Sequence, residues 1–127
     1  MYVYQRRYKN NGISIETILA EKYETIIRRN ITTTRMRDFY DIYTLYKLKK
    51  DEINYEILKE AVERTSDKRG SQEIIKDYEE IIEDIKEDSY LRSLWEVYLS
   101  ENKYIGDLTF DKVVGVVTIL SNRINEL

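Results

Sequence analysis

Apolar residues recur at helical spacing along most of the chain, separated by short polar stretches. The clearest run follows Ser14, a typical N-cap residue, and extends to about Arg29. Its apolar positions fall on one face of a helix: Ile15, Ile18, Leu19, Tyr23, Ile26 and Ile27. A polar link at 30–34 follows, and a second amphipathic helix is predicted from near Thr34 to Leu48. The rest of the chain is organised around this helical pair.

Four more helices are predicted downstream. They run from Asn54 to about Arg64, from Ser71 through Ile85, from Ser89 through Leu99 and from Thr109 through Ile124. In each, the first residue is the predicted N-cap. The segments Thr65–Gly70 and Asn102–Leu108 are predicted to be loops. The apolar positions expected to face inward include Ile57, Leu58, Ala61, Val62, Ile74, Ile75, Leu91, Trp95, Phe110 and Val113.

One segment has a different period. Residues 2–8 alternate tyrosines with Val3, Gln5 and Arg7, a pattern typical of a short β-strand. Because a single strand is not stable alone, it is expected to pair with another chain or with an upstream region. The predicted fold is therefore a mostly α single domain over 1–127, a helical bundle of about six helices with one short N-terminal strand.

Composition narrows the possible chemistry. Of 127 residues, 42% are apolar and 35% charged, with no proline and four glycines, which suits a helix-rich globular protein. The absence of cysteine and histidine excludes disulfides, thiol chemistry, a serine–histidine triad and the usual zinc ligand sets. Neither a signal peptide nor an apolar run of membrane-spanning length is present. A cytoplasmic location without membrane partners is the expectation.

Charge is unevenly distributed. Residues 1–50 hold eleven basic and five acidic side chains, whereas residues 51–127 hold ten and nineteen. The acidic face of the helix after Ser71 is predicted to be solvated surface. Anionic ligands should therefore be attracted to the first half of the chain.

Two charged residues in that basic half interrupt apolar faces. Lys22 falls between Ile18 and Ile26, and Asp38 shares a stripe with Ile42 and Leu45. Since a lone buried ammonium is costly, Lys22 must extend to solvent, pair with a carboxylate or hold an anion.

Nearby charges leave alternatives open. Arg28, Arg29, Arg35 and Arg37 surround the link between the first two helices. They form either a solvated surface or a contact for a tRNA-like acceptor or a nucleotide. Asp41 is predicted to be structural, bonded to a neighbouring helix or to Arg35.

Two short motifs carry a family resemblance. Leu-Ala-Glu-Lys at 19–22 and Arg-Met-Arg-Asp-Phe-Tyr-Asp-Ile at 35–42 resemble the third and fourth motifs of the AbiEii/AbiGii toxin family of nucleotidyltransferases. The closing helices, with Leu-Trp-Glu-Val-Tyr at 94–98, also resemble the helical tail of that family. Its members are toxins of bacterial abortive-infection (phage-defence) and type IV toxin–antitoxin systems.

The resemblance implies a helical part that completes a nucleotidyltransferase site. The complete enzyme would use Mg²⁺ and a nucleoside triphosphate (NTP) and transfer a nucleotide to an acceptor such as tRNA. Lys22 is then implied to contact phosphate, and Asp38 to orient or deprotonate the attacking hydroxyl. Glu21 and Asp41 are expected to have structural or supporting roles. A cognate antitoxin, acting at the gene level, is the implied partner.

The chain departs from the family in one respect. The family's Gly-Ser turn followed by Asp-x-Asp, its metal centre, has no counterpart, because Gly70-Ser71 leads into a helix and no Asp-x-Asp occurs. We therefore expect no metal site or cofactor in this chain alone, no activity alone, and a need for an N-terminal nucleotidyltransferase half or a partner chain. The alternative is a non-catalytic helical module that binds a partner protein or RNA, with the strand at 2–8 pairing to the partner's sheet.

Overall fold

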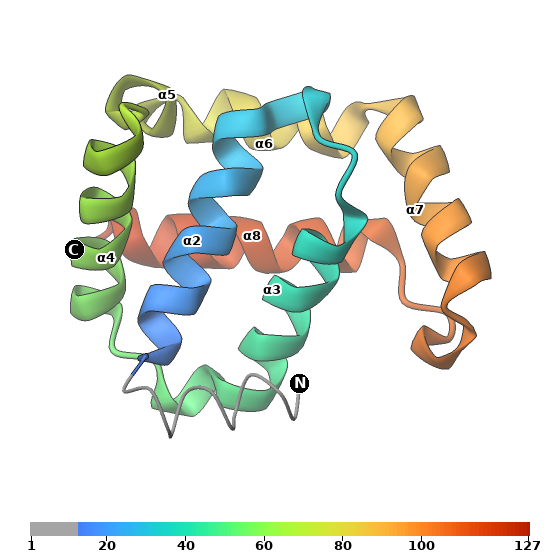
Figure 1. Ribbon diagram of the computed structural model, residues 1–127, viewed down its shortest axis with the longest axis horizontal. Coiled ribbons are helices and arrows are strands. Elements are labelled where there is room, and N and C mark those ends of the chain that lie inside the picture. Colours follow the sequence, from blue (N-terminus) through green and yellow to red (C-terminus); the bar gives the residue numbers. More distant parts are fainter. Residues whose placement is uncertain (1–12) are drawn as a thin grey trace.

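The computed structural model describes residues 13–127, and these residues form helices and short connections (Figure 1). The mostly α prediction is confirmed, while the predicted strand at 2–8 lies outside the described residues. No helix in residues 13–127 has both the length and the apolar character needed to cross a bilayer. The elements are α2 (Ile15–Arg29), η1 (Asn30–Thr32), α3 (Met36–Lys49), η2 (Lys50–Glu52), α4 (Tyr55–Arg69), α5 (Gln72–Lys76), α6 (Tyr78–Glu87), α7 (Ser89–Glu101), η3 (Lys103–Ile105) and α8 (Phe110–Asn125).

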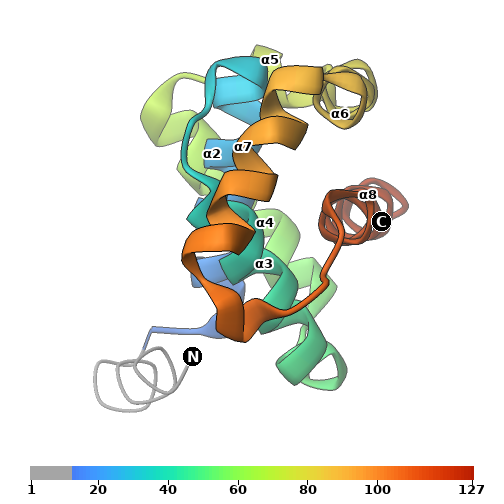
Figure 2. The ribbon, with the colours of Figure 1, turned by 90° about the vertical axis from the view of Figure 1, so that its right-hand side faces the viewer.

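The helices are arranged in two layers. Helices α4, α2, α3 and α7 stand side by side in the view of Figure 1, while α8 runs across behind them and α6 crosses near one end. Figure 2, turned by 90°, shows α8 and α6 nearly end-on on one side of the upright helices. Helix α2 contacts both α3 and α4, and α8 contacts α3, α4 and α6. Of the two helices that carry the candidate motifs, α3 therefore rests directly on the C-terminal helix, and α2 packs on α3.

The core lies between these layers. The predicted apolar face of α2 is buried at all six positions, and Phe39, Leu91, Trp95 and Leu120 have no exposed surface. The ring centroids of Phe39 and Phe110 are 5.4 Å apart, which ties α3 to the first turn of α8. Burial of such large side chains supplies most of the driving force for folding.

Three predicted N-caps are present. The side-chain oxygens of Ser14, Asn54 and Thr109 accept the backbone N–H three residues later, at 3.1, 3.1 and 3.2 Å. The predicted cap at Ser89 is wrong, because Ser89 is already helical and the Asp88 carboxylate accepts the Leu91 N–H at 2.9 Å. An aspartate one residue earlier offers the same acceptor together with a favourable charge at the helix N-terminus.

The loop predicted at Thr65–Gly70 is also wrong, since α4 continues to Arg69. The chain leaves the helix at Gly70, whose φ of +68° gives the left-handed conformation common after helix C-termini. Ser66 is buried, so this last turn packs against the rest of the fold.

The long helix predicted after Ser71 is divided at Asp77 into α5 and α6, so residues 13–127 contain seven α-helices where about six were expected. The break changes the direction of the chain. Helix α5 packs on α2 and α4, whereas α6 packs mainly on α8 and η1 and also contacts α2. Ile81, Ile82 and Ile85 are buried, but Ile74 is left 39% exposed. Ile57, also predicted to face inward, is 43% exposed.

Candidate functional site

Lys22, in the middle of α2, lies against the first turns of α3. Its Nζ is 3.0 Å from Asp38 Oδ1 and 3.1 Å from Asp41 Oδ2. The side chains of the two aspartates are only 4% and 5% exposed, and that of Lys22 is 18% exposed. One ammonium thus bridges two buried carboxylates at the α2–α3 interface.

Local sequence places these groups together. Helix α2 ends at Arg29, and the next residue, Asn30, adopts a positive φ of 52°. The chain then returns through η1 to start α3 at Met36. Asp38 and Asp41 are three residues apart and therefore neighbours on one face of α3. Asp38, Ile42 and Leu45 are all buried, as their shared stripe predicts. Since α2 contacts α3 directly, that face meets Lys22.

The carboxylates keep Lys22 charged. Burial alone would lower its pKa, but the hydrogen bond to Asp38 and the charge of Asp41 outweigh burial, so the pKa of Lys22 is raised above its usual value. At neutral pH the residue is an ammonium. It can hold or stabilise negative charge but does not act as a base.

Asp38 uses its two oxygens differently. Oδ1 accepts the hydrogen bond from Lys22, whereas Oδ2 is buried and accepts no hydrogen bond from the described residues. Arg35 Nε lies 3.6 Å from Oδ2 and forms an ion pair with it. Buried carboxylate oxygens normally accept a hydrogen bond, so Oδ2 has capacity for a further donor.

Asp41 and Arg37 extend the charged cluster. Besides Lys22, Asp41 pairs with Arg37, whose Nε is 3.7 Å away and whose side chain is 73% exposed. A bond from Asp41 to a neighbouring helix was one of the expectations, and Lys22 of α2 supplies it. The pairing with Arg37 was not anticipated.

The predicted arginine cluster divides into two pairs. Arg28 and Arg29 end α2, where Arg28 Nε donates to Glu24 at 2.9 Å and Arg29 is half-buried. Arg35 and Arg37 lie at the start of α3 with mostly exposed side chains. Only the second pair contacts the aspartates that bind Lys22.

Sequence reasoning missed Glu24. Its fully buried carboxylate accepts hydrogen bonds from Arg28 Nε, from Arg69 Nη1 at 2.6 Å and from Ser71 Oγ at 2.7 Å. The signal was available: Glu24 lies one turn after Ala20 on the buried face of α2. The cluster connects α2 to the end of α4 and the residue before α5. Glu21, by contrast, is exposed.

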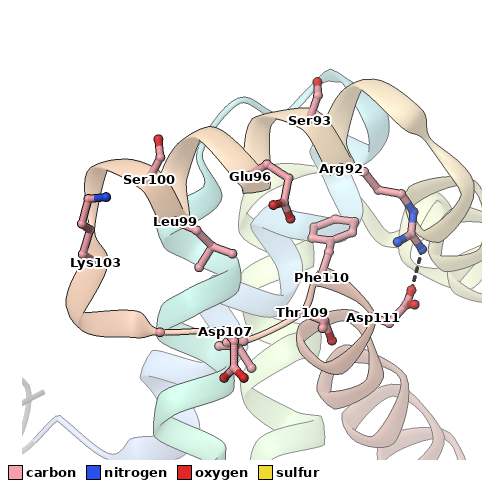
Figure 3. A pocket seen from close by; sticks show the side chains of 12 residues that line it. Arg92, Ser93, Glu96, Leu99, Ser100, Lys103, Asp107, Thr109, Phe110 and Asp111 are labelled. Carbon is pink, nitrogen blue, oxygen red and sulfur yellow. Dashed lines mark hydrogen bonds and ion pairs between the residues drawn. The ribbon is translucent and has the colours of Figure 1, made fainter.

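A separate hollow of about 860 Å³ lies between α7 and the start of α8 (Figure 3). At one end of it, Arg92 of α7 pairs with Asp111 of α8 and stands over the ring of Phe110. Its lining contains none of the candidate site residues that the sequence predicted. The charged candidates therefore belong to the α2–α3 interface.

Comparison with known protein families identifies a match. The family model described as "Nucleotidyl transferase AbiEii toxin, Type IV TA system" matches residues 11–116. The matched segment includes Lys22, Asp38 and Asp41 and ends within α8. Neither the curated proteins nor the solved structures contain a significant match.

Proposed function

Because the chain belongs to the AbiEii family of nucleotidyltransferase toxins of type IV toxin–antitoxin systems, we propose that it contributes Lys22 and Asp38 to nucleotide transfer. The reaction is transfer of a nucleoside monophosphate from an NTP to a hydroxyl of an acceptor such as tRNA, inside the cell. The observation that carries the proposal is the asymmetry of Asp38, in which Lys22 holds Oδ1 while buried Oδ2 accepts no hydrogen bond from the described residues.

Asp38 is the proposed general base. On binding, the acceptor would displace the exposed side chain of Arg35 from buried Oδ2. Its hydroxyl would then donate to Oδ2, attack the α-phosphorus and pass its proton to that oxygen. The bond from the α-phosphorus to its bridging oxygen breaks, and pyrophosphate leaves. Atoms and charge balance without any further reactant.

Lys22 is the proposed electrostatic partner. While Asp38 is ionised, the ammonium is shared between two carboxylates at 3.0 and 3.1 Å. Proton transfer to Asp38 removes one of these negative charges, so the ammonium becomes more strongly available to the charge developing on the pyrophosphate. Such transfers depend mainly on positioning and electrostatic stabilisation.

The metal that the family implies is not assigned to these residues. Among residues 13–127 no three acidic side chains are grouped as ligands. Asp38 and Asp41 are both engaged by Lys22, so this donor set does not fit Mg²⁺. Binding of Mg²⁺ would belong to an N-terminal nucleotidyltransferase half or to a partner chain.

The test is a transfer assay with a labelled NTP and tRNA, using this chain alone and together with a sheet domain from the family. We expect transfer only with both parts. Lys22→Ala and Asp38→Asn should each lower the rate by about 100-fold or more, while Asp51→Asn, at an exposed carboxylate, leaves the rate unchanged. Full transfer by a folded Asp38→Asn protein would overturn the proposed base.

A second candidate is a non-catalytic helical module that binds a partner protein or RNA. The observation that favours it is that Lys22 is already neutralised by its own chain, as in a purely structural ion bridge. RNA binding that persists in Lys22→Ala and Asp38→Ala, without transfer activity in any combination, would establish this alternative.

A further inference from the structure

Next to the charged cluster, on the other side of α3, three tyrosines from separate elements come together. The ring centroid of Tyr40 on α3 is 6.3 Å from that of Tyr98 on α7 and 6.3 Å from that of Tyr104 in η3. We call Tyr40, Tyr98 and Tyr104 the tyrosine platform. Figure 1 shows α3 standing between α2, which carries Lys22, and α7.

The platform packs on the core at its base and is open to solvent at its edge. Tyr98 packs on buried Trp95, with centroids 5.5 Å apart, and the Trp95 indole N–H donates to the Leu108 carbonyl at 2.9 Å. Tyr104 is 76% exposed and stands at 82° to Tyr40. The two rings thus form a corner on the surface.

Charge connects the platform to the aspartates. Burial, Tyr104 and the charge of Asp41 raise the pKa of Tyr98, and the charge of Arg37 opposes them. Tyr98 therefore lies within electrostatic reach of both charged residues. Arg37 itself pairs with Asp41. Around α3, the helical order of side chains is Asp38, Asp41, Arg37 and Tyr40. The exposed arginine thus lies on the ridge between Lys22 and the platform.

We propose that the tyrosine platform stacks an unpaired base of a single-stranded RNA acceptor, at a nucleotide that precedes the one whose hydroxyl meets Asp38. The inference rests on the function proposed above. In this arrangement the terminal nucleotide of the RNA would lie at the α2–α3 interface. A phosphate would contact Arg37, and a preceding base would contact Tyr40 and Tyr104.

Two arguments select this occupant. Aromatic side chains are the usual partners of splayed RNA bases, and arginine is the usual partner of phosphate. In addition, a helix with its side chains is ~10 Å wide, so a strand crossing α3 brings an earlier base, and not the terminal one, to the platform. The open corner offers little enclosure, whereas small ligands are generally bound in concave pockets that bury most of their surface.

The experiment measures binding of this chain to a 5′-fluorescent six-nucleotide single-stranded RNA by anisotropy. Matched RNAs carry one abasic site, either at the 3′-terminal nucleotide or at one of the two preceding it. We expect Tyr104→Ala to weaken binding about 5- to 100-fold, Tyr104→Trp to retain it, and Tyr90→Ala, which removes a 60% exposed tyrosine from α7, to have no effect.

The position of the abasic site within the RNA provides the decisive comparison. An abasic site at a preceding nucleotide should weaken binding as much as Tyr104→Ala does, and combining the two changes should give no further loss. An abasic site at the 3′ end should have a smaller effect. Equal binding of all the RNAs, or equal effects of Tyr104→Ala and Tyr90→Ala, would overturn the platform.

A competition arm tests a free nucleotide as the occupant. If GTP or CTP displaces the RNA from wild type but not from Tyr104→Ala, the platform binds a mononucleotide and the RNA assignment is wrong. The proposed function fails separately: it is lost if Asp38→Asn retains transfer, whatever Tyr104→Ala does to RNA binding.

Discussion

Lys22 and Asp41 form an ion pair of 3.1 Å, beside the 3.0 Å pair of Lys22 with Asp38. Replacing Lys22 by methionine would leave two buried carboxylates facing each other. We expect a loss of roughly 3 kcal/mol in unfolding free energy, measured by urea denaturation at pH 7. Lys50→Met, at an exposed position, should change stability little.

A triple variant tests whether uncompensated charge causes the loss of stability in Lys22→Met. If uncompensated charge is responsible, Asp38→Asn with Asp41→Asn in the Lys22→Met background should recover a large part of the loss, because no buried charge then remains unpaired. A triple variant as unstable as Lys22→Met would contradict this explanation. It would point to lost packing of the lysine stem.

Glu24 is expected to matter as much for the fold as Lys22. Glu24→Gln removes the charge that three donors from α2, α4 and the start of α5 share. We expect a loss of about 1–3 kcal/mol, read from thermal and urea unfolding. Glu21→Gln, on the exposed face of the same helix, is the matched control. Similar losses of unfolding free energy in both variants would show that the buried cluster around Glu24 does not stabilise the fold.

Tyr23 should make the protein sensitive to alkali. Burial raises its pKa to about 12 from 10.0, although the hydrogen bond with Ser121, 2.7 Å long, acts in the opposite direction. Since the folded state holds this proton more tightly, the associated stability is complete below pH 10. Between pH 10 and 12 it is lost at about 1.4 kcal/mol per pH unit.

Tyr23→Phe isolates this contribution. At pH 7 the variant should be about 1 kcal/mol less stable because it lacks the hydrogen bond to Ser121. Its deficit should shrink and then reverse as the pH rises through 11, as urea unfolding at several pH values would show. Tyr90→Phe, at an exposed ring, should stay parallel to wild type. Parallel curves for Tyr23→Phe would refute the raised pKa.

Replacing either of two glycines by alanine should change the stability of the protein, in opposite directions at the two positions. Gly70 has a φ of +68° and Gly115 is inside α8, and an added Cβ would meet nothing within 4 Å at either. Gly70→Ala should cost about 1 kcal/mol through backbone strain. Gly115→Ala should stabilise by roughly 0.5–1 kcal/mol through helix propensity. Thermal unfolding checks both, and a shift of the same sign in both would be inconsistent with the backbone argument.

Periodicity predicted the helices well, because each buries one face. It failed where tertiary contacts decide the outcome. The break at Asp77 has no glycine or proline to signal it. It separates α5, which packs on α2 and α4, from α6, which packs mainly on α8 and η1 and also contacts α2. Similarly, the last turn of α4 contains polar residues, but Arg69 contributes a hydrogen bond to Glu24.

For the site, the sequence indicated Lys22 and Asp38 as charges on apolar faces, and the structure places them 3.0 Å apart. Their catalytic roles stay a prediction. The bridge from Lys22 to Asp41 depends on how α2 packs on α3, which spacing alone does not determine. The tyrosine platform was not predictable either, since its rings come from positions 40, 98 and 104 and meet only through the packing of α7.

The contact of Phe39 with Phe110 has a consequence for synthesis on the ribosome. Lys22 and Asp38 are translated before α8, the helix on which α3 rests. A nascent chain therefore contains both candidate residues before it contains the support that holds them together. A premature stop codon after residue 109 would yield a product that contains every proposed site residue yet lacks the means to position them.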